Sequence, residues 1–138
     1  MTADPIGVLD TSTLVLIDRI EPERLPEEPV ITAVTLAELS VGPLVAPTEN
    51  ERVARQLRLQ QVESSFDPLP FDAKAARAFG AVAASLRRTG RKATRAFDAM
   101  IAATAIAEEL PLYTCNPRDF EGIDGLQVHG VPHPDAPA

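Results

Sequence analysis

Short apolar stretches alternate with helical patterns along this chain, and that alternation is the feature that most constrains its fold. The stretches at residues 6–10, 30–32, 112–115 and 126–130 have the length and character of short buried strands. Helical patterns separate them, and connections of that kind favour parallel strands with helices on both faces of the sheet. The sequence therefore predicts an α/β protein with three layers, α/β/α, around a short central parallel sheet.

Capping residues and breaker residues place the segments between these strands. Thr48 and Glu51 form the pattern of a capping box that begins one helix. Asp72 caps another helix, which Gly90 ends. Residues 21–29 hold three prolines, which we expect to prevent regular structure. The other predicted segments are helices at 12–20, 33–42 and 96–110, a loop at 66–71 and a short helical turn at 116–120.

The composition fits one ordinary domain. The chain has 138 residues, of which 45% are hydrophobic, and this is sufficient for the core of a single domain. Cys115 is the only cysteine, so an internal disulfide is excluded. No stretch reaches the ~18 apolar residues of a membrane helix, and the N-terminus lacks the pattern of a secretion signal. We therefore expect a cytoplasmic protein without membrane contact, with one domain over residues 1–130 and a frayed C-terminal tail over 131–138.

The charge of the chain is unevenly distributed. A net charge of −7 argues against nucleic acid as a partner. Residues 87–95, however, hold five basic side chains and no acidic one, and such a strip on an acidic body can bind a polyanion. The ordinary alternative is a solvated helix end and loop. The five residues are Arg87, Arg88, Arg91, Lys92 and Arg95.

Four acidic side chains follow predicted strands or begin helices that pack against strand ends. They are Asp10, Glu38, Asp98 and Asp119. In a parallel sheet these positions share the rim where ligands gather. Four carboxylates on one rim would repel one another, and a divalent cation removes that conflict. Mg²⁺ and Mn²⁺ prefer carboxylate and water oxygens, and the chain offers no cysteine and histidine set for zinc. A rim of acids holding such a cation suits phosphodiester hydrolysis.

Each of these acids also has an ordinary structural explanation. Asp10 can cap a helix, and Glu38 can complete a capping box that starts at Thr35. Asp98 and Asp119 fall in the first turns of predicted helices, where a negative charge interacts favourably with the helix dipole. The residues alone therefore leave both interpretations open.

Three blocks of the sequence combine these acids with specific neighbours. They are VLDTSTLV (8–15), TAVTLAELSVG (32–42) and RAFDAMIAATAIAEELPLYTCNPRDFEGIDGLQV (95–128). The last block is the most specific, because D-A-x-I-A-A-x-A is followed by T-x-N-x-x-D-F at a set distance. Over nearly the whole chain the sequence resembles the PIN-domain ribonucleases, and more closely VapC, the toxin half of bacterial toxin–antitoxin pairs. The resemblance implies a PIN-like α/β/α fold.

The resemblance also implies roles for the acids and their neighbours. The metal-binding and catalytic acids would be Asp10, Glu38, Asp98 and Asp119, the last being the most variable of the four in the family. Thr11, Ser12 and Asn116 would lie beside the metal, and Ser12 would orient a carboxylate or a water. The basic strip over 87–95 would then contact RNA phosphates.

Activity and partners follow from the same resemblance. It implies an endoribonuclease that depends on Mg²⁺ or Mn²⁺ and cuts a structured RNA, such as tRNA or ribosomal RNA, with metal-activated water. It further implies a homodimer, and a higher assembly with a cognate VapB-type antitoxin that inhibits it.

Three other classes of protein share some of these sequence features. A haloacid-dehalogenase-like phosphatase also places an Asp after its first strand, but it requires a second Asp where this chain has Ser12. A phospho-accepting receiver domain requires a late lysine, and no lysine follows Lys92. A non-catalytic PIN-like binding module fits the same residues and differs only in lacking metal-dependent cleavage.

Overall fold

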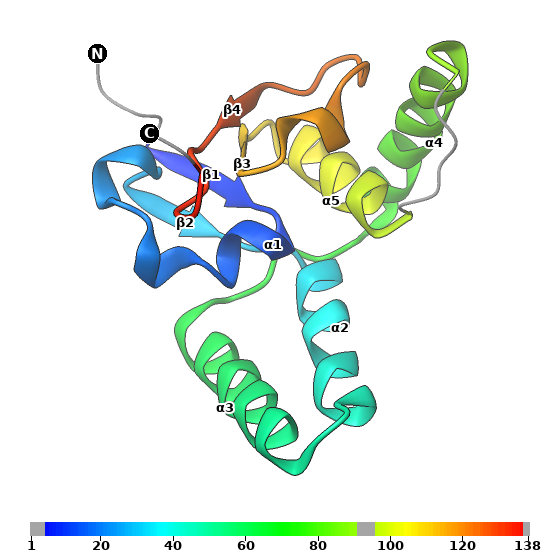
Figure 1. Ribbon diagram of the computed structural model, residues 1–138. Coiled ribbons are helices and arrows are strands. Elements are labelled where there is room, and N and C mark those ends of the chain that lie inside the picture. Colours follow the sequence, from blue (N-terminus) through cyan, green and yellow to red (C-terminus); the bar gives the residue numbers. More distant parts are fainter. Residues whose placement is uncertain (1–4, 91–95, 137–138) are drawn as a thin grey trace.

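A central four-stranded sheet organises the protein in this computed structural model, which describes residues 5–90 and 96–136 (Figure 1). The strand order is β2-β1-β3-β4, and every pairing is parallel, as the sequence predicts. The strands are β1 (Ile6–Leu9), β2 (Glu28–Val30), β3 (Leu112–Thr114) and β4 (Val128–Gly130). The α-helices are α1 (Thr11–Leu14), α2 (Ala33–Val41), α3 (Glu49–Ser65), α4 (Ala73–Arg88) and α5 (Ala96–Ala107). Four 3₁₀ turns complete the described elements: η1 (Ile17–Arg19), η2 (Pro22–Arg24), η3 (Gly42–Val45) and η4 (Pro117–Phe120).

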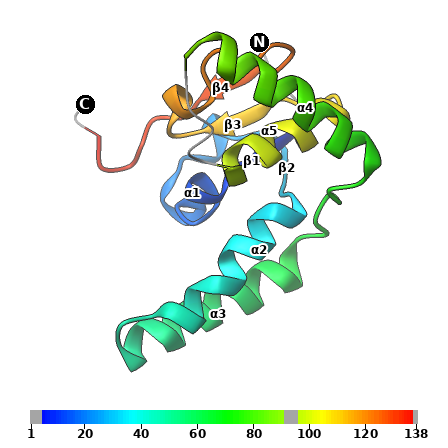
Figure 2. The same cartoon turned by 90° about the vertical axis from the view of Figure 1, so that its right-hand side faces the viewer.

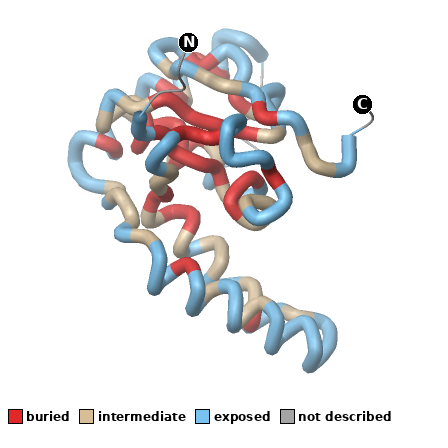
Figure 3. Tube along the Cα trace, turned by 90° about the vertical axis from the view of Figure 1, so that its left-hand side faces the viewer, coloured by how far each residue is buried: buried red, intermediate tan, exposed pale blue. Residues whose placement is uncertain are grey.

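The sheet separates two apolar cores, because neighbouring residues of a strand face opposite sides. Val8 of β1 and Leu112 of β3 pack with α4 and α5 on one face. Leu9 and Tyr113, the next residues along, pack with α1, η1 and the end of α3 on the other face. Figure 3 shows the buried residues gathered along the sheet and the elements against it. This arrangement is the predicted α/β/α architecture.

The α2–η3–α3 segment extends away from the sheet as a pair of helices (Figures 1 and 2). The two helices pack against each other, and Arg55 of α3 donates a hydrogen bond from its guanidinium to the carbonyl oxygen of Gly42 at 2.9 Å. Apolar side chains remain exposed on this segment; they are Val41, Leu44, Val45, Val53 and Leu57. The helix expected over 33–42 ends at Val41 in the structure. The chain then continues through the 3₁₀ turn η3 before α3 begins.

The predicted caps of α3 and α4 are confirmed. Thr48 accepts a hydrogen bond from the Glu51 amide at 3.1 Å, although the Glu51 carboxylate pairs with Arg55. Asp72 accepts from the Ala75 amide at 3.0 Å, and α4 turns its apolar face to the core. Gly90, with φ +74°, follows the last turn of α4 in the left-handed conformation that glycine adopts most easily.

Two local predictions near the N-terminus are wrong. The helix expected over 12–20 ends at Leu14 and is followed by the separate turn η1, because this stretch is rich in β-branched and hydroxyl residues of low helix propensity. The strand expected at 30–32 instead spans residues 28–30 and includes Pro29. A proline is tolerated there because β2 is an edge strand. The proline-rich connector therefore contains both a 3₁₀ turn and part of a strand.

The C-terminal segment is packed more tightly than a frayed tail. Val131 is buried, and its amide donates to the Thr114 carbonyl oxygen at 2.8 Å, which continues the pairing of β4 with β3. Farther along, Asp135 forms an ion pair with Arg19. Residues 131–136 thus belong to the folded body. Among the described helices, none has both the length and the apolar character needed to cross a membrane.

Candidate active site

Asp10 occupies the end of β1 and is almost completely buried, with 3% of its surface exposed. One carboxylate oxygen, Oδ1, accepts from the Thr13 amide at 3.3 Å, so Asp10 does cap α1. The other, Oδ2, accepts from the hydroxyls of Ser12 at 3.1 Å and Thr114 at 2.9 Å. A buried charge is tolerated only with such partners. The cap explanation is correct, but it accounts for only one of the three hydrogen bonds.

This bonding pattern leaves the two oxygens of Asp10 in different states. A carboxylate oxygen accepts about two hydrogen bonds. Oδ2 has two donors, from Ser12 and Thr114, and is therefore saturated. Among the described residues, Oδ1 accepts one bond, from the Thr13 amide at 3.3 Å, and so has unused acceptor capacity. Oδ1 is therefore the oxygen of Asp10 that we expect to face a bound cation.

Glu38 lies in the second turn of α2 and is tied to α1. Its Oε1 accepts a hydrogen bond from the Thr11 hydroxyl at 2.6 Å. The predicted capping box between Thr35 and Glu38 is wrong, because α2 begins earlier: its N-cap is Thr32, whose hydroxyl accepts from the Thr35 amide at 3.3 Å. With the capping explanation removed, the position of Glu38 is explained by its bond to Thr11, next to Asp10 in the chain.

Asp98 and Asp119 are carried by neighbouring elements. Asp98 lies in the first turn of α5 and Asp119 in η4, and both are partly buried and engaged in polar interactions. Helix α2 packs against both α1 and α5, and α5 packs against η4. Figures 1 and 2 show the start of α5 on the same side of the molecule as α1 and the start of α2. The elements that hold the four acids are thus contiguous.

Ser12 and Asn116 also meet at this site. The Asn116 side chain donates from Nδ2 to the Ser12 hydroxyl at 3.1 Å, and its backbone amide donates to the Thr114 hydroxyl at 2.9 Å. Although Asn116 precedes η4, its side chain makes no capping bond to that turn. Ser12, Thr114 and Asn116 therefore form a hydrogen-bonded border around Asp10.

The described residues contain no group of three Asp, Glu, His or Cys side chains that could hold a metal ion. Two of the four acids, Asp10 and Glu38, accept hydrogen bonds from hydroxyl groups. Mg²⁺ is commonly bound through one or two carboxylates plus water molecules, so a cage of three acids is not required. Asp10 Oδ1 and the Glu38 carboxylate are hard oxygen donors of the kind that Mg²⁺ and Mn²⁺ prefer.

Cys115 lies beside the site but is poorly suited to chemistry. Its amide donates to the Thr13 hydroxyl at 2.9 Å. Burial raises the pKa of the Cys115 thiol; a hydrogen bond with Thr13 opposes this effect, and the charge of Asp10 adds to it. A thiol in this state is mostly protonated near neutral pH, and the thiolate is the form that attacks or binds metal.

The sequence patterns predict no role at the site for three threonines: Thr13, Thr35 and Thr114. All three are buried, and their hydroxyls bond to the site or to its neighbours. Threonine is also common in strands and at helix starts for reasons unrelated to function. Thr35 therefore drew attention only as the start of a capping box, and Thr114 only as the first residue of T-x-N-x-x-D-F.

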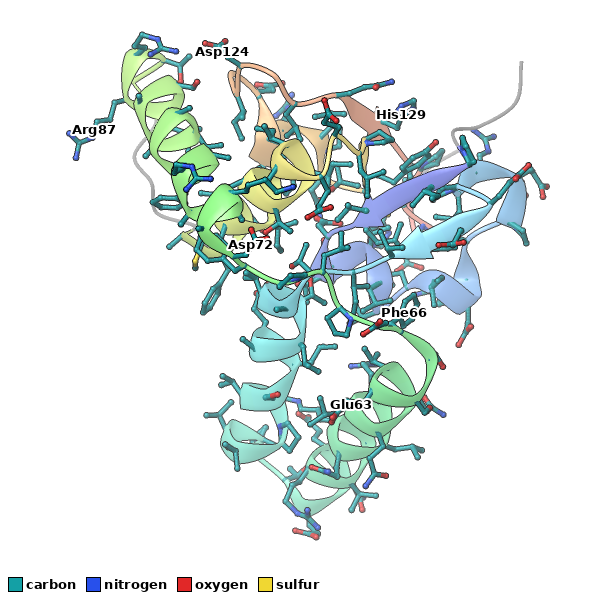
Figure 4. All side chains as sticks on the ribbon, turned by 180° about the vertical axis from the view of Figure 1, so that it is seen from behind. Glu63, Phe66, Asp72, Arg87, Asp124 and His129 are labelled. Carbon is teal, nitrogen blue, oxygen red and sulfur yellow. The ribbon has the colours of Figure 1, made fainter. Side chains whose placement is uncertain are left out.

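Of the basic side chains of the strip over residues 87–95, the structure describes Arg87 and Arg88. Arg88 donates to Asp124 at 2.6 Å and to Ser85 at 3.2 Å. Arg87 is exposed at the end of α4 and points away from the body of the protein (Figure 4). Arg91, Lys92 and Arg95 lie outside the described residues. Contact between this strip and RNA stays a prediction.

A cavity of about 340 Å³ lies away from the four acids. It is bordered by the end of α1, by η1 and by the last turns of α3, where Figure 4 labels Phe66. Its lining mixes apolar side chains, among them Leu14, with the charged side chains of Asp18 and Arg58.

Residues 7–126 match the family described as the PIN domain. Ribonuclease VapC5 from Mycobacterium tuberculosis is 36% identical over 127 residues, which cover 90% of this chain and 92% of that protein. A tRNA(fMet)-specific endonuclease VapC from Shigella flexneri is 32% identical over 128 residues, which cover 88% of this chain and 94% of that protein.

A solved structure extends the similarity to three dimensions. The crystal structure of VapBC-5, a member of the VapBC family of toxin–antitoxin systems from Mycobacterium tuberculosis, matches with a TM-score of 0.80 at 34% identity, covering 92% of this chain and 99% of the other. The residues that match the PIN domain, 7–126, include all four acids. The chain belongs to the PIN-domain family, and within it to the VapC proteins.

Proposed function

We propose that this protein is an RNA-cleaving toxin of the VapC type, an endoribonuclease that depends on Mg²⁺ or Mn²⁺. The observation that carries the proposal is the buried carboxylate of Asp10, whose Oδ2 accepts two hydrogen bonds while Oδ1 accepts one. Thr11, the next residue in the chain, donates a hydrogen bond to Glu38. One relative is named a ribonuclease, and another a tRNA(fMet)-specific endonuclease. The proposed substrate class is accordingly a structured RNA, tRNA or ribosomal RNA.

The residues of the site have distinct roles in this proposal. Asp10 and Glu38 would hold the cation, with Asp98 and Asp119 contributing directly or through water. A bound divalent cation supplies an activated water and offsets negative charge at the scissile phosphate. Ser12 and Thr114 keep Asp10 in one orientation, and Asn116 keeps Ser12 in place. No protein nucleophile is needed, which agrees with the raised pKa of the Cys115 thiol.

The proposed partner is a VapB-type antitoxin. The solved VapBC-5 structure belongs to a toxin–antitoxin system, and a toxin that cuts cellular RNA must be restrained in the cytoplasm where it is made. We further propose a homodimer that enters a larger complex with the antitoxin. Purification of the chain with the product of an adjacent short reading frame, followed by light scattering, tests both statements.

The activity test uses purified full-length protein and total cellular RNA. Cleavage is expected with Mg²⁺ or Mn²⁺ and is expected to disappear with EDTA, and mapping of new 5′ ends identifies the RNA. Asp10→Asn, Glu38→Gln and Asp98→Asn should each reduce the cleavage rate by at least about tenfold, since even the loss of a group that only supports a metal ligand costs about 10–100-fold. Circular dichroism should show that each variant is folded.

A matched control variant is Glu49→Gln, which also removes one carboxylate. Glu49 pairs with Arg52 in the exposed first turn of α3 and should leave cleavage unchanged. If the three site variants cut RNA at the normal rate, the proposal is wrong. If folded wild-type protein cuts no RNA with either cation, the protein is instead a non-catalytic binding module.

A further inference from the structure

Two threonine hydroxyls and the Glu38 carboxylate form a series of hydrogen bonds that begins in the interior of the protein. The Thr35 hydroxyl lies 2.9 Å from the Thr11 hydroxyl, which lies 2.6 Å from Glu38 Oε1. Thr35 is completely buried, whereas Thr11 and Glu38 are partly buried. The three residues come from α1 and α2, so the chain of bonds crosses between two helices.

The direction of these hydrogen bonds is fixed by the acceptor at the end. A carboxylate can only accept, so Thr11 must use its single hydroxyl proton on Glu38. Thr11 therefore has no proton left for Thr35, and the Thr35 hydroxyl must donate to the Thr11 oxygen. The bonds consequently run one way, from Thr35 to Thr11 to Glu38, and hydrogen bonds in such a series polarise and strengthen one another.

The local structure of α2 does not account for the Thr35 hydroxyl. The helix is capped by Thr32, and only the amide of Thr35 takes part in that cap. Thr104 in α5 is an instructive contrast: it is equally buried, and its hydroxyl donates to the Met100 carbonyl oxygen one turn back. That bond is the usual arrangement for a threonine inside a helix. Thr35 instead directs its hydroxyl out of its own helix toward Thr11.

We propose that Thr35 is a positioning residue that acts through Thr11 to hold the Glu38 carboxylate ready for a divalent cation. The inference rests on the proposed function, since it assumes that Glu38 is a cation ligand. The Thr35 hydroxyl is linked to the Glu38 carboxylate through the Thr11 hydroxyl. It fixes the direction of the Thr11 proton, and it thereby keeps the Thr11 hydroxyl directed at Glu38 Oε1.

The test measures Mn²⁺ affinity by electron paramagnetic resonance on the full-length protein without RNA. Thr11→Val should weaken Mn²⁺ binding by roughly tenfold or more, the loss typical when a partner of a metal ligand is removed. Thr35→Val, one hydrogen bond farther away, should weaken it by a smaller factor of roughly threefold. Thr35→Ser and Thr11→Ser keep the hydroxyls and should restore wild-type affinity. Thr104→Val is the control for loss of a buried hydroxyl elsewhere, and it should leave Mn²⁺ affinity unchanged.

A double variant distinguishes a relay, in which Thr35 acts through Thr11, from two separate effects on Mn²⁺ affinity. Because the bonds act in series, Thr35→Val should cause no further loss of Mn²⁺ affinity in protein that already carries Thr11→Val. A threefold loss that persists in that background would overturn the proposal. So would a Thr35→Val variant that binds Mn²⁺ as well as the Thr104→Val control does. If Thr35→Val does not fold, Thr11→Val decides: unchanged Mn²⁺ affinity overturns the relay, and a tenfold loss that Thr11→Ser restores supports it.

The same measurements separate this inference from the proposed function. Wild-type protein that binds Mn²⁺ and cuts RNA, with no effect of Thr35→Val, overturns the relay alone. Variants that show the expected losses of Mn²⁺ affinity in a protein that cuts no RNA support the relay and contradict the nuclease function. Wild-type protein that binds no Mn²⁺ contradicts both.

Discussion

At the residue scale, the site is held by hydroxyl groups that act on two carboxylates. Asp10 receives hydrogen bonds from Ser12 and Thr114, and Glu38 receives one from Thr11. A hydrogen bond to a charged group is worth about 1.5–3 kcal/mol, more than one between neutral groups. These hydroxyls therefore offset part of the cost of placing negative charge in the protein interior.

Thr114 offers a direct measure of that compensation. Thr114→Val keeps the shape of the side chain but removes a donor from a carboxylate that is 3% exposed. The variant should lower the free energy of unfolding by about 1–3 kcal/mol, because a buried charged acceptor loses a partner. Urea denaturation measures the change. A stability within about 0.5 kcal/mol of the wild type, the range of ordinary surface substitutions, would contradict this account.

Cys115 gives a prediction about pH. Burial raises the pKa of its thiol, so at pH 8 a smaller fraction is thiolate than in an unperturbed cysteine. Because the thiolate is the reactive form, alkylation of folded protein by iodoacetamide should be slow at pH 8 and should keep rising at pH values where an exposed cysteine has levelled off. Urea-unfolded protein is the control and should react at the ordinary rate. Equal rates in the two states would show that the thiol is not perturbed.

At the scale of elements, the sheet is sensitive to packing at β1. Tyr113 of β3 stacks on His129 of β4, with ring centroids 4.6 Å apart and planes 7° from parallel. The same tyrosine ring covers Gly7 of β1. A Cβ atom added at Gly7 would lie 2.6 Å from Tyr113 Cε1 and 3.1 Å from Cβ of Pro26. Gly7 is thus required by the close approach of an aromatic ring, since its backbone conformation is an ordinary extended one.

Two glycine variants test this difference. Gly7→Ala should lower the free energy of unfolding by about 1–3 kcal/mol, the usual cost of overpacking. Gly80→Ala should raise it by about 0.5–1 kcal/mol, because Gly80 lies inside α4 with nothing within 4 Å of an added Cβ. Thermal or urea unfolding compares the two. Equal changes in both variants would show that contact with Tyr113 does not decide the effect at Gly7.

At the scale of the whole molecule, the net charge of −7 and a site built from acids should both favour the binding of cations. A cation that binds the folded protein and not the unfolded chain stabilises it by mass action. If the site binds Mg²⁺ as proposed, the melting temperature should rise with Mg²⁺ concentration. At a Mg²⁺ concentration of 100 times Kd, the free energy of unfolding should increase by about 2.7 kcal/mol. Differential scanning fluorimetry over a Mg²⁺ series at constant ionic strength measures the shift.

The variants assign that stabilisation to the site. Asp10→Asn should abolish the dependence of the melting temperature on Mg²⁺, whereas Asp124→Asn, which removes an exposed carboxylate paired with Arg88, should leave it intact. A shift that survives in Asp10→Asn would mean that Mg²⁺ acts through the general negative charge of the protein and not through this site.

Local features of the sequence were sufficient to predict the general fold. The alternation of apolar stretches and helical patterns predicts the parallel sheet, Thr48 and Asp72 identify the starts of α3 and α4, and the acid-containing blocks indicate the PIN family. Strand and helix periodicity, capping and short motifs each depend on residues only a few positions apart, so they can be recognised without knowing the fold.

What only the tertiary structure decided depends on residues far apart in the chain. Thr114 reaches Asp10 across 104 positions, and Thr11 reaches Glu38 across 27. Pro29 is tolerated in β2 because that strand lies at the edge of the sheet, and Val131 is buried because it joins the core beside β3. Hydrogen-bond partners and burial are properties of the packed chain, because a side chain's partners are set by the elements that folding brings beside it. The sequence alone therefore named the four acids as candidates, and the fold decided which groups hold Asp10 and Glu38.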